Sequence, residues 1–452
     1  MIHNIITMKK VRNFKASSMQ RHVLSKLQNW YQSPIRKPLV IQGARQVGKT
    51  WVMRHFGEQH FKKIAYINFD NNQPMKALFD GDFDIQRLLL GLQIESGVDI
   101  KPNDTLLIFD EIQEVPKALS ALKYFYENAP EYSIITAGSL LGISVHQGLS
   151  FPVGKVDFLA MYPMDFIEFL WACGESRLVD LLESQDWQLI TTLKNKFIER
   201  LRQYYFVGGM PEAVDTFVKT QNFAQVRQVQ NNLLMAYEYD FSKHIHDSKI
   251  IPKVRAVWQS LPEQLAKENK KFFANQAQSG ARLKDFESAI GWLVASGLVQ
   301  QIFRVTKPNL PLVSYQDNVF KLYFLDVGLL AAKSGLDVSA LLEGNRLFTE
   351  FKGALTEQYV LQQLLAMQSN PVFYWANERS TAEVDFIVQL ANHIVPIEVK
   401  AEENLKAKSL RSYHDQFSPD LTIRTSMSDY REQDWMVNLP LYAFSHFKQF
   451  TH

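Results

Sequence analysis

Residues 43–50 constrain the fold of this chain more than any other segment. They read Gly-Ala-Arg-Gln-Val-Gly-Lys-Thr, which is the G-x-x-x-x-G-K-T pattern of a phosphate-binding loop. The apolar run 38–41 precedes the loop without helical periodicity and indicates a strand, whereas 51–56 reads as the start of a helix. A strand, a glycine loop and a helix in this order aim backbone N–H groups and the helix dipole at phosphate oxygens. The sequence therefore predicts a site for a nucleoside triphosphate.

The loop pattern also assigns individual roles. Lys49 supplies a point charge to the phosphates and counts as a catalytic residue, while the Thr50 hydroxyl is expected to ligate Mg²⁺. The predicted nucleotide-binding residues are the whole loop and the first residue of the helix, namely Gly43, Ala44, Arg45, Gln46, Val47, Gly48, Lys49, Thr50 and Trp51. The expected cofactors are ATP and Mg²⁺.

Length and charge limit the remaining possibilities. A chain of 452 residues is too long for one core and suggests about three domains. The formal net charge of +2 dictates no partner, but the segment before the phosphate loop is basic and contains no acid. Its cations are Lys9, Lys10, Arg12, Lys15, Arg21, Lys26, Arg36 and Lys37. We interpret this lead as a solvated N-terminal helix, with contact to nucleic acid or another acidic surface as the alternative.

Cysteine content and hydropathy indicate the cell compartment. The single cysteine, Cys173, excludes an internal disulfide and a zinc site built from cysteines. The N-terminus lacks the apolar core of a signal peptide, and no run of about 18 uncharged apolar residues could span a bilayer. The sequence thus predicts a soluble cytoplasmic protein that has no membrane partner.

A second segment supplies the acidic residues that nucleotide hydrolysis requires. Residues 103–111 form an apolar strand that ends in Asp110 and Glu111, at the edge where open α/β sheets place their ligands. Asp110 is expected to hold Mg²⁺ directly or through water, and Glu111 to orient and deprotonate the attacking water. Glu111 is therefore the predicted catalytic base.

Further strands are expected at 60–70, 132–139 and 156–161. The strand 132–139 ends in Ser139, whose hydroxyl would either sense the γ-phosphate or cap the following helix. Lys155, just before the strand 156–161, is a candidate charge donor to a neighbouring nucleotide.

The motifs GARQVGKT, LLIFDEIQ, ITAGS, VGKVDFLAMYPMDFIEFL and YYFVGGMPEAV occur in this order along most of the chain. Together they resemble the bacterial and archaeal AAA-type ATPases (AAA_14 type) whose C-terminal half is a domain of unknown function of the DUF4143 type. The resemblance implies an ASCE-type sheet with the Walker B strand beside the phosphate-loop strand. It does not supply a cellular role.

The sequence Gly-Gly-Met-Pro at 208–211 interrupts a segment of helical spacing and indicates a tight turn into a new helix. A similar Gly-x-Pro element in signalling ATPases packs its proline ring against adenine, so the resemblance makes Pro211 a candidate nucleotide contact. The alternative is a simple corner between two helices.

Residues 272–324 have the pattern of a winged helix-turn-helix. A turn is expected at 279–281, wing strands at 299–305 and 321–325, and one buried helical face made of Leu283, Phe286, Ile290, Leu293 and Val294. This pattern suggests sequence-specific DNA binding, but Lys284 is the only basic residue of the second helix. We therefore favour a structural lid or a protein-contact surface.

The C-terminal segment carries a second constellation of charged residues. A helix at 350–365 bears Glu357, and strands are expected at 373–375, 382–388 and 394–400. Asp385, followed by Glu398-x-Lys400, has the spacing of a PD-(D/E)xK nuclease core. Strand alternation puts Glu398 and Lys400 on one side of their strand. Asp385, Glu398 and Glu357 are the predicted ligands of a second divalent ion, with Lys400 as the catalytic residue that activates or stabilises the attacking water.

These observations predict an α/β protein whose P-loop domain has a parallel sheet. The expected division is a basic lead (1–20), a P-loop ATPase domain (21–172), a helical lid with a winged-helix region (173–345) and a nuclease-like α/β domain (346–452). The expected function is an ATPase whose nucleotide state controls a C-terminal domain acting on DNA or another nucleic acid. The alternative is an ATP-dependent switch whose C-terminal domain binds a protein partner or a second copy of the chain without catalysis.

Overall fold

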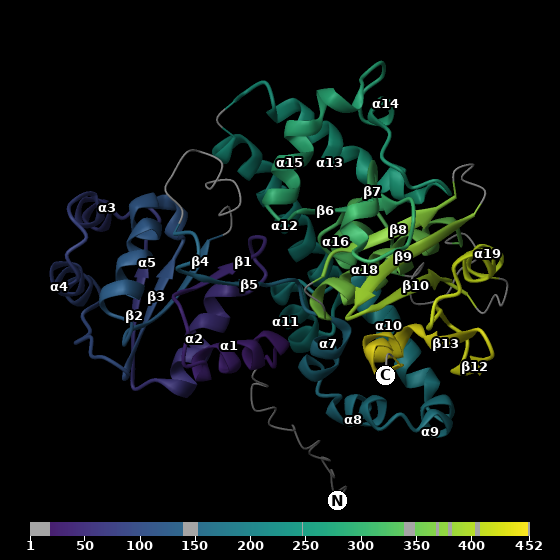
Figure 1. The fold of residues 1–452 in the computed structure, drawn as a ribbon, viewed down its shortest axis with the longest axis horizontal. Coiled ribbons are helices and arrows are strands. Elements are labelled where there is room, and N and C mark those ends of the chain that lie inside the picture. The colour runs from purple at the N-terminus through teal and green to yellow at the C-terminus, as the bar shows by residue number, and fades with distance from the viewer. Residues whose placement is uncertain are drawn as a thin grey trace, which may run out of the picture.

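The computed structural model describes residues 19–138, 152–245, 247–338, 349–367, 370–377, 382–402 and 407–450. Within these ranges a parallel sheet lies at one end of the molecule and a larger mixed sheet at the other, with a layer of helices between them (Figure 1). Ser139 and most of the basic lead, residues 1–18, lie outside the described residues. The structure confirms the predicted α/β class and the parallel sheet.

The parallel sheet has the strand order β2-β3-β4-β1-β5. Its strands are β1 (Leu39–Gln42), β2 (Lys63–Asn68), β3 (Thr105–Asp110), β4 (Ser133–Gly138) and β5 (Asp157–Ala160). The expectation that the Walker B strand β3 lies beside the phosphate-loop strand β1 is wrong. The strand β4 separates them, since it pairs with β1 on one side and with β3 on the other. All residues of β4 are buried.

Helices cover both faces of this sheet. The side chains of Leu39 and Ile41 pack against α1 (His22–Gln32) and α2 (Lys49–His60). Val40, Leu107 and Phe109 point to the opposite face and pack against α3, α4 and α5. These three helices are Gln73–Asp80, Ile85–Ser96 and Pro116–Asn128. The alternation explains why the strands read as continuous apolar runs, since both faces are buried.

The helical layer follows β5 along the chain. It comprises α7 (Phe166–Ala172), α8 (Ser176–Ser184), α9 (Trp187–Thr192), α10 (Lys194–Val207), α11 (Pro211–Thr220), α12 (Phe223–His244), α13 (Ile251–Ala266) and, later in the chain, α16 (Val327–Lys333). Buried side chains of these helices belong to one continuous apolar cluster that extends from α1 and α2 to the C-terminal sheet. The P-loop domain and the C-terminal part are therefore packed through a shared core.

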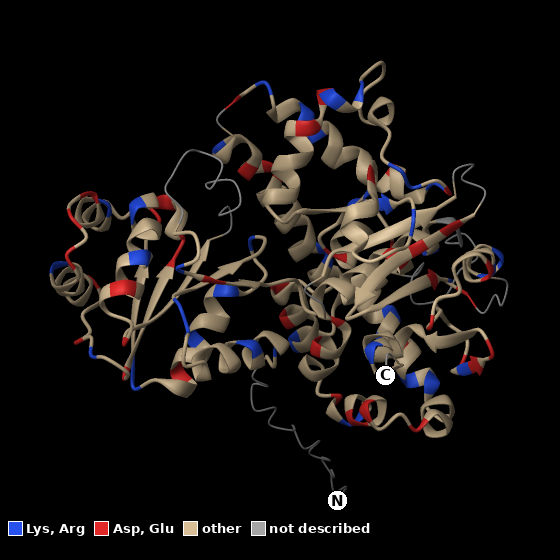
Figure 2. Ribbon diagram, in the orientation of Figure 1, with Lys and Arg blue, Asp and Glu red and all other residues tan. Residues whose placement is uncertain are grey.

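The region predicted as a winged helix differs from the expectation in two respects. It contains α14 (Ala274–Ala277), α15 (Glu287–Ala295) and the antiparallel strands β6 (Val299–Val305) and β7 (Gln316–Phe324). Leu283 is 37% exposed and does not join the buried face, because it lies in a 3₁₀ turn before α15. The strand β6 also pairs with β8 of the C-terminal sheet, so the boundary expected at 345/346 runs through a sheet. Figure 2 shows both signs of charge on the ribbon around α13, α14 and α15.

The mixed sheet has the order β12-β13-β11-β10-β9-β8-β6-β7. Its remaining strands are β8 (Val372–Ala376), β9 (Glu383–Leu390), β10 (His393–Val399), β11 (Ile423–Ser426), β12 (Arg431–Gln433) and β13 (Met436–Pro440). The helix α18 (Thr349–Met367) packs on one face and α19 (Lys408–Phe417) on the other, and a 3₁₀ segment, Leu441–Phe450, follows β13. The helix and three strands predicted from the C-terminal sequence are therefore present.

Among the described residues, no helix is both long enough and apolar enough to cross a membrane.

Candidate functional site: the phosphate loop and its cavity

Two glycines fix the backbone of the phosphate loop. Gly43 has φ +153°, and a Cβ atom there would lie 2.2 Å from the carbonyl oxygen of Met161. Gly48, the residue before α2, has φ +94°, a left-handed conformation that favours glycine. The motif therefore requires glycine at both positions for conformational reasons.

Lys49 is buried inside the loop. Its Nζ donates hydrogen bonds to the carbonyl oxygens of Gly43 (2.9 Å) and Ala44 (2.7 Å). Burial lowers the pKa of Lys49 to about 8, although the nearby carboxylates of Glu111 and Asp110 act in the opposite direction. The loop thus holds a desolvated ammonium group where an incoming phosphate would meet it.

Asp110 connects the loop helix to the Walker B strand. Its Oδ2 accepts hydrogen bonds from Thr50 Oγ1 (2.6 Å) and from Tyr66 OH (3.0 Å), and its Oδ1 accepts one from the Glu111 N–H (3.1 Å). Partial burial and the carboxylate raise the pKa of Tyr66 to about 12, so this phenol is a hydrogen-bond donor. The sequence analysis missed Tyr66, which pairing of β2 with β3 could have placed near Asp110.

Glu111 leaves the end of β3 in a strained conformation. Its φ of +51° lies in the left-handed region, which residues other than glycine adopt uncommonly. Its Oε2 accepts a hydrogen bond from Gln113 Nε2 (2.6 Å). Both the backbone turn and Gln113 fix the direction in which this carboxylate points.

These residues line a cavity of about 580 Å³. Its walls are Arg45, Gln46, Gly48, Lys49, Thr50, Trp51, Asn68, Asp70, Asp110, Glu111, Glu114, Pro211, Glu212 and Lys243. The structure thus brings Pro211 to the same cavity as the phosphate loop, while the side chains of Ala44 and Val47 are buried in the core. Asn68, Asp70, Glu114, Glu212 and Lys243 were not singled out from the sequence, because the end of β2, the turn after β3, α11 and α12 bring them here from separate parts of the chain.

The helix α12 contacts the loop through Arg45. The Arg45 guanidinium pairs with Asp240 (2.5 Å) and lies 3.1 Å from His244 Nε2, and Tyr237 OH donates to the Arg45 carbonyl oxygen (2.9 Å). Burial, assisted by Arg45, lowers the pKa of His244. Arg45 therefore connects the phosphate loop to the helical layer, a connection that the sequence does not reveal.

The donor set suits Mg²⁺. The ion prefers oxygen ligands, and it usually keeps several waters and substrate phosphates around one or two protein groups. Thr50 Oγ1 and Asp110 Oδ2 are two such oxygens, and their direct contact shows that they converge. No group of three or more His, Cys, Asp or Glu side chains among the described residues is arranged to hold a metal ion.

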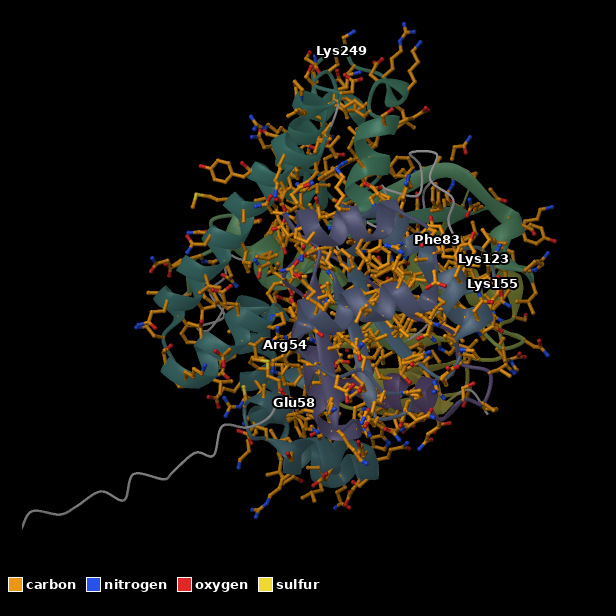
Figure 3. The ribbon with its side chains drawn as sticks, turned by 90° about the vertical axis from the view of Figure 1, so that its left-hand side faces the viewer. Arg54, Glu58, Phe83, Lys123, Lys155 and Lys249 are labelled. Atoms are coloured by element: carbon orange, nitrogen blue, oxygen red, sulfur yellow. The ribbon has the colours of Figure 1, made fainter. Side chains whose placement is uncertain are left out.

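Lys155 lies on the outer side of the P-loop domain (Figure 3). Its Nζ pairs with Glu127 at 2.8 Å, and this carboxylate raises the pKa of Lys155. The cavity does not include Lys155.

The C-terminal carboxylates also come together. Asp385 on β9 and Glu398 on β10 occupy adjacent positions in the antiparallel pairing, and Asp385 Oδ2 accepts a hydrogen bond from the Val399 N–H (2.7 Å). Glu398 pairs with Lys400 through one oxygen (2.5 Å), whereas its buried Oε2 accepts no hydrogen bond from the described residues. Burial, together with Glu357 and Glu398, raises the pKa of Asp385.

The contacts of Glu357 differ from those expected of a metal ligand. Its two oxygens pair with Lys270 (2.6 Å) and accept a hydrogen bond from Tyr323 OH (3.1 Å). Burial acts to raise the pKa of Glu357, but Lys270 and Lys321 outweigh it and the net direction is downward. Lys321 is itself buried and pairs with Glu383. The sequence analysis missed both lysines, since they come from segments far from the D…ExK pattern.

Models of known protein families match successive segments of this chain. Residues 35–170 match the family model described as an AAA domain. Residues 198–340 and 352–444 match two domains of unknown function, DUF8612 and DUF4143 respectively. The N-terminal part is thus an AAA-type P-loop domain, and the C-terminal part is of the DUF4143 type.

Two curated proteins match a shorter stretch. They are the uncharacterized proteins Mb2031c of Mycobacterium bovis and Rv2008c of Mycobacterium tuberculosis, each 35% identical over 94 residues. The alignment covers 20% of this chain and 20% of each relative, so the match spans about one fifth of their length.

Solved structures match over longer stretches at low identity. The Aeropyrum pernix Orc1 protein in complex with DNA is 13% identical, with 69% of this chain and 90% of that chain covered and a TM-score of 0.26. The Thermotoga maritima RuvB Holliday junction branch migration motor is 12% identical, with 62% and 87% covered and a TM-score of 0.29. Both TM-scores are below 0.5, and no property of those proteins is transferred to this chain.

Proposed function

We propose that this protein is a Mg²⁺-dependent ATPase whose reaction takes place in the cavity of the phosphate loop. The observation that carries the proposal is the hydrogen bond between Thr50 and Asp110. It brings the end of the Walker B strand to the first turn of the loop helix, beside Lys49 and Glu111 in one cavity. Such an arrangement holds a triphosphate, a metal ion and a water-activating carboxylate at once.

In this reaction each residue has a defined task. Lys49 and the loop N–H groups bind the phosphate oxygens, and Thr50 and Asp110 hold the metal ion. Mg²⁺ supplies positive charge that offsets the charge developing on the phosphates. Glu111 orients a water molecule and accepts its proton as the water oxygen bonds to the γ-phosphorus and the bond to the β-phosphate oxygen breaks. The products are ADP and inorganic phosphate.

Pro211 is the proposed contact of the nucleotide base. It begins α11, and its ring lies close to Gly48 at the wall of the cavity. A proline ring offers a compact apolar surface that can pack on an adenine face, and its position at the first turn of a helix costs no backbone hydrogen bond.

Binding of a fluorescent ATP analogue with and without Mg²⁺ tests the proposal. Wild type is expected to bind more tightly with Mg²⁺, and Lys49→Ala is expected to lose binding. Lys62→Ala is the matched control, because Lys62 is an exposed lysine outside the cavity. Equal binding by wild type and Lys49→Ala would contradict the assignment of the site.

A nuclease-like C-terminal domain, controlled by the nucleotide state, is the second function that we propose. It is favoured by Asp385 and Glu398 on adjacent strands, by Lys400 beside them, and by the unpartnered buried Oε2 of Glu398, which suits a cation. The competing function is a module that binds a partner without catalysis. It is favoured by Glu357, whose oxygens are already held by Lys270 and Tyr323.

Metal binding and cleavage separate these two functions. Thermal stabilisation by Mn²⁺ and cleavage of DNA and RNA would be compared for wild type, Asp385→Asn and Lys400→Ala, with and without ATP. The exposed Asp434→Asn is the control for loss of one carboxylate. Stabilisation and cleavage that both disappear in Asp385→Asn would support the nuclease. Retained nucleotide binding without either effect in wild type would support the partner-binding module.

A further inference from the structure

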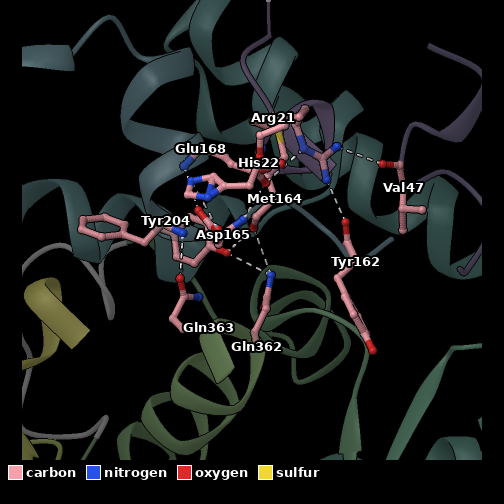
Figure 4. Close-up of polar contacts among 12 residues, drawn as sticks. Arg21, His22, Val47, Tyr162, Met164, Asp165, Glu168, Tyr204, Gln362 and Gln363 are labelled. Carbon is pink, nitrogen blue, oxygen red and sulfur yellow. Dashed lines mark hydrogen bonds and ion pairs between the residues drawn. The ribbon is translucent and has the colours of Figure 1, made fainter. Parts of the chain in front are cut away.

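The best-supported new role belongs to Arg21, which lies behind the phosphate loop rather than in the cavity. Arg21 precedes α1 and is 5% exposed, so the interpretation of the basic lead as a solvated helix is wrong for this residue. Its guanidinium donates to the carbonyl oxygens of Val47 (3.1 Å) and Tyr162 (2.9 Å). Its third nitrogen, Nε, pairs with Glu168 at 3.0 Å. Figure 4 shows these contacts converging from three elements.

The contact with Val47 bears directly on the geometry of the loop. When the N–H groups of a phosphate loop turn inward to an anion, the carbonyl oxygens of the same peptides turn outward and need donors. The Val47 carbonyl oxygen finds its donor in Arg21. A Cβ atom on Gly48 would lie 3.5 Å from Arg21 Nη1, so the guanidinium lies directly under the last turn of the loop.

Glu168 fixes the guanidinium from the other side. One oxygen of Glu168 accepts a hydrogen bond from the His22 N–H (2.6 Å), and the other accepts one from the Asp165 N–H (3.1 Å). Asp165 in turn caps α7 by accepting from the Glu168 N–H (2.8 Å). The Arg21 side chain is therefore held by a carboxylate that is itself fixed by two backbone groups.

The same segment is anchored to the C-terminal part. The Phe166 N–H donates to Gln363 Oε1 (2.8 Å), and Gln362 Nε2 contacts the Met164 carbonyl oxygen (3.3 Å) and Asp326 (3.0 Å). Gln362 and Gln363 belong to α18, the helix that carries Glu357. Polar contacts and the backbone of residues 164–168 thus connect Val47, through Arg21 and Glu168, to α18 (Figure 4).

We propose that Arg21 is a positioning residue of the nucleotide site. Its guanidinium holds the Val47 peptide so that the loop N–H groups face the phosphates, and Glu168 anchors that guanidinium to the segment held by α18. The proposal rests on nucleotide binding at the phosphate loop. Arg21 touches neither substrate nor metal, so its effect is on the preorganisation of the loop.

Three variants separate this role from a general contribution to folding. Arg21→Met alone would leave the Glu168 carboxylate buried without its cation, so the double variant Arg21→Met with Glu168→Gln removes both charges together. Arg21→Lys keeps the charge, but one ammonium group cannot reproduce the fork geometry in which the guanidinium donates to two carbonyl oxygens and pairs with Glu168. Lys26→Met is the matched control, because Lys26 is an exposed cation on the same helix.

Two readouts are needed: the Kd for Mg-ATP, and amide hydrogen exchange of residues 43–50 without nucleotide. In the double variant we expect the Kd to rise about tenfold or more and loop exchange to speed up, while the rest of the P-loop domain keeps its protection. Arg21→Lys should give a smaller change in the same direction, and Lys26→Met should match wild type.

Loop exchange at the wild-type rate in either Arg21 variant would overturn the proposal. Because that readout needs no ligand, it tests Arg21 even if wild type fails to bind ATP, a result that would instead contradict the proposed function. Faster exchange throughout the domain would also overturn it, since that pattern indicates a structural role alone.

Discussion

Thr50 Oγ1 donates a 2.6 Å hydrogen bond to Asp110 Oδ2, although the strands that lead to these two residues are not neighbours. The strand β4 lies between β1 and β3, so the two strand ends are roughly 10 Å apart at the usual spacing. The loop and the first turn of α2 cross this distance. A magnesium ion bound by Thr50, Asp110 and phosphates would therefore take its protein ligands from both sides of β4.

Replacing Thr50 by valine should remove most of the dependence of nucleotide binding on Mg²⁺. Valine keeps the shape of threonine but offers no oxygen to the ion, and loss of even an outer-shell partner of a metal ligand typically costs about 10–100-fold in metal affinity. The measurement is the ratio of the Kd in EDTA to the Kd in Mg²⁺. Thr50→Ser restores the hydroxyl and should recover the ratio, and an unchanged ratio in Thr50→Val would show that Thr50 is not a ligand.

Replacing Gly43 by alanine should destabilise the P-loop domain by about 3 kcal/mol or more. The new methyl group would lie 2.2 Å from the Met161 carbonyl oxygen, so the loop or β5 must move. Gly291→Ala is the control, since a Cβ there meets nothing within 4 Å and the position is an exposed helix interior. We expect that control to gain about 0.5–1 kcal/mol. Equal unfolding free energies for the two variants would contradict the loop geometry.

The free energy of unfolding should depend on pH through the titration of Asp165. Burial and the neighbouring Glu168 raise the pKa of Asp165 to about 6, while His22 and Arg21 act against this shift. A carboxyl with a raised folded-state pKa binds more protons in the folded state than in the unfolded state between about pH 4 and 6. Its contribution to stability therefore increases as the pH falls through that window.

The test compares wild type with Asp165→Asn, which keeps the capping oxygen but cannot ionise. The difference in unfolding free energy should favour wild type by about 1 kcal/mol more at about pH 5 than at about pH 7.5. A difference that stays constant with pH, or that changes in the opposite direction, would show that Asp165 does not titrate in this way.

Lys321 should contribute strongly to the stability of the C-terminal part. It is 1% exposed, pairs with the part-buried Glu383 and lies over the ring of Tyr374, so Lys321→Met removes a cation that also stabilises the buried carboxylates Glu357 and Asp385. Breaking such a buried pair costs about 3–5 kcal/mol. Lys267→Met removes an exposed pair with Glu263 and should change stability by no more than about 0.5 kcal/mol. Similar unfolding free energies for the two variants would be inconsistent with the buried pair.

The sequence predicted local geometry well. The strand, loop and helix around residues 43–50 follow from glycines and an apolar run that are contiguous in the chain, and the same holds for the strand that ends in Asp110. The proximity of Asp385 and Glu398 could also be predicted from the sequence, because one turn joins their two strands. The roles assigned to these residues stay predictions that the experiments above address.

Contacts between segments far apart in the sequence could not be predicted from the same patterns. Asp240 and Arg21 contact the phosphate loop from separate elements, and nothing in the residues around them in the sequence indicates these contacts. Leu283 fits a helical period but lies in a turn, so its side chain is exposed. Strand order depends on backbone pairing between segments far apart in the sequence, and for that reason the place of β4 between β1 and β3 was not anticipated.

The most direct measurement is ATP turnover by Glu111→Gln together with the amount of nucleotide that the variant binds. Glutamine keeps the size of the side chain but cannot accept the proton of water, so we predict Mg-ATP binding close to that of wild type and little residual hydrolysis. Lys49→Ala, assayed in parallel, should lose both binding and turnover. Hydrolysis by Glu111→Gln at the wild-type rate would contradict the assignment of Glu111 as the base and, with it, the proposed reaction in this cavity.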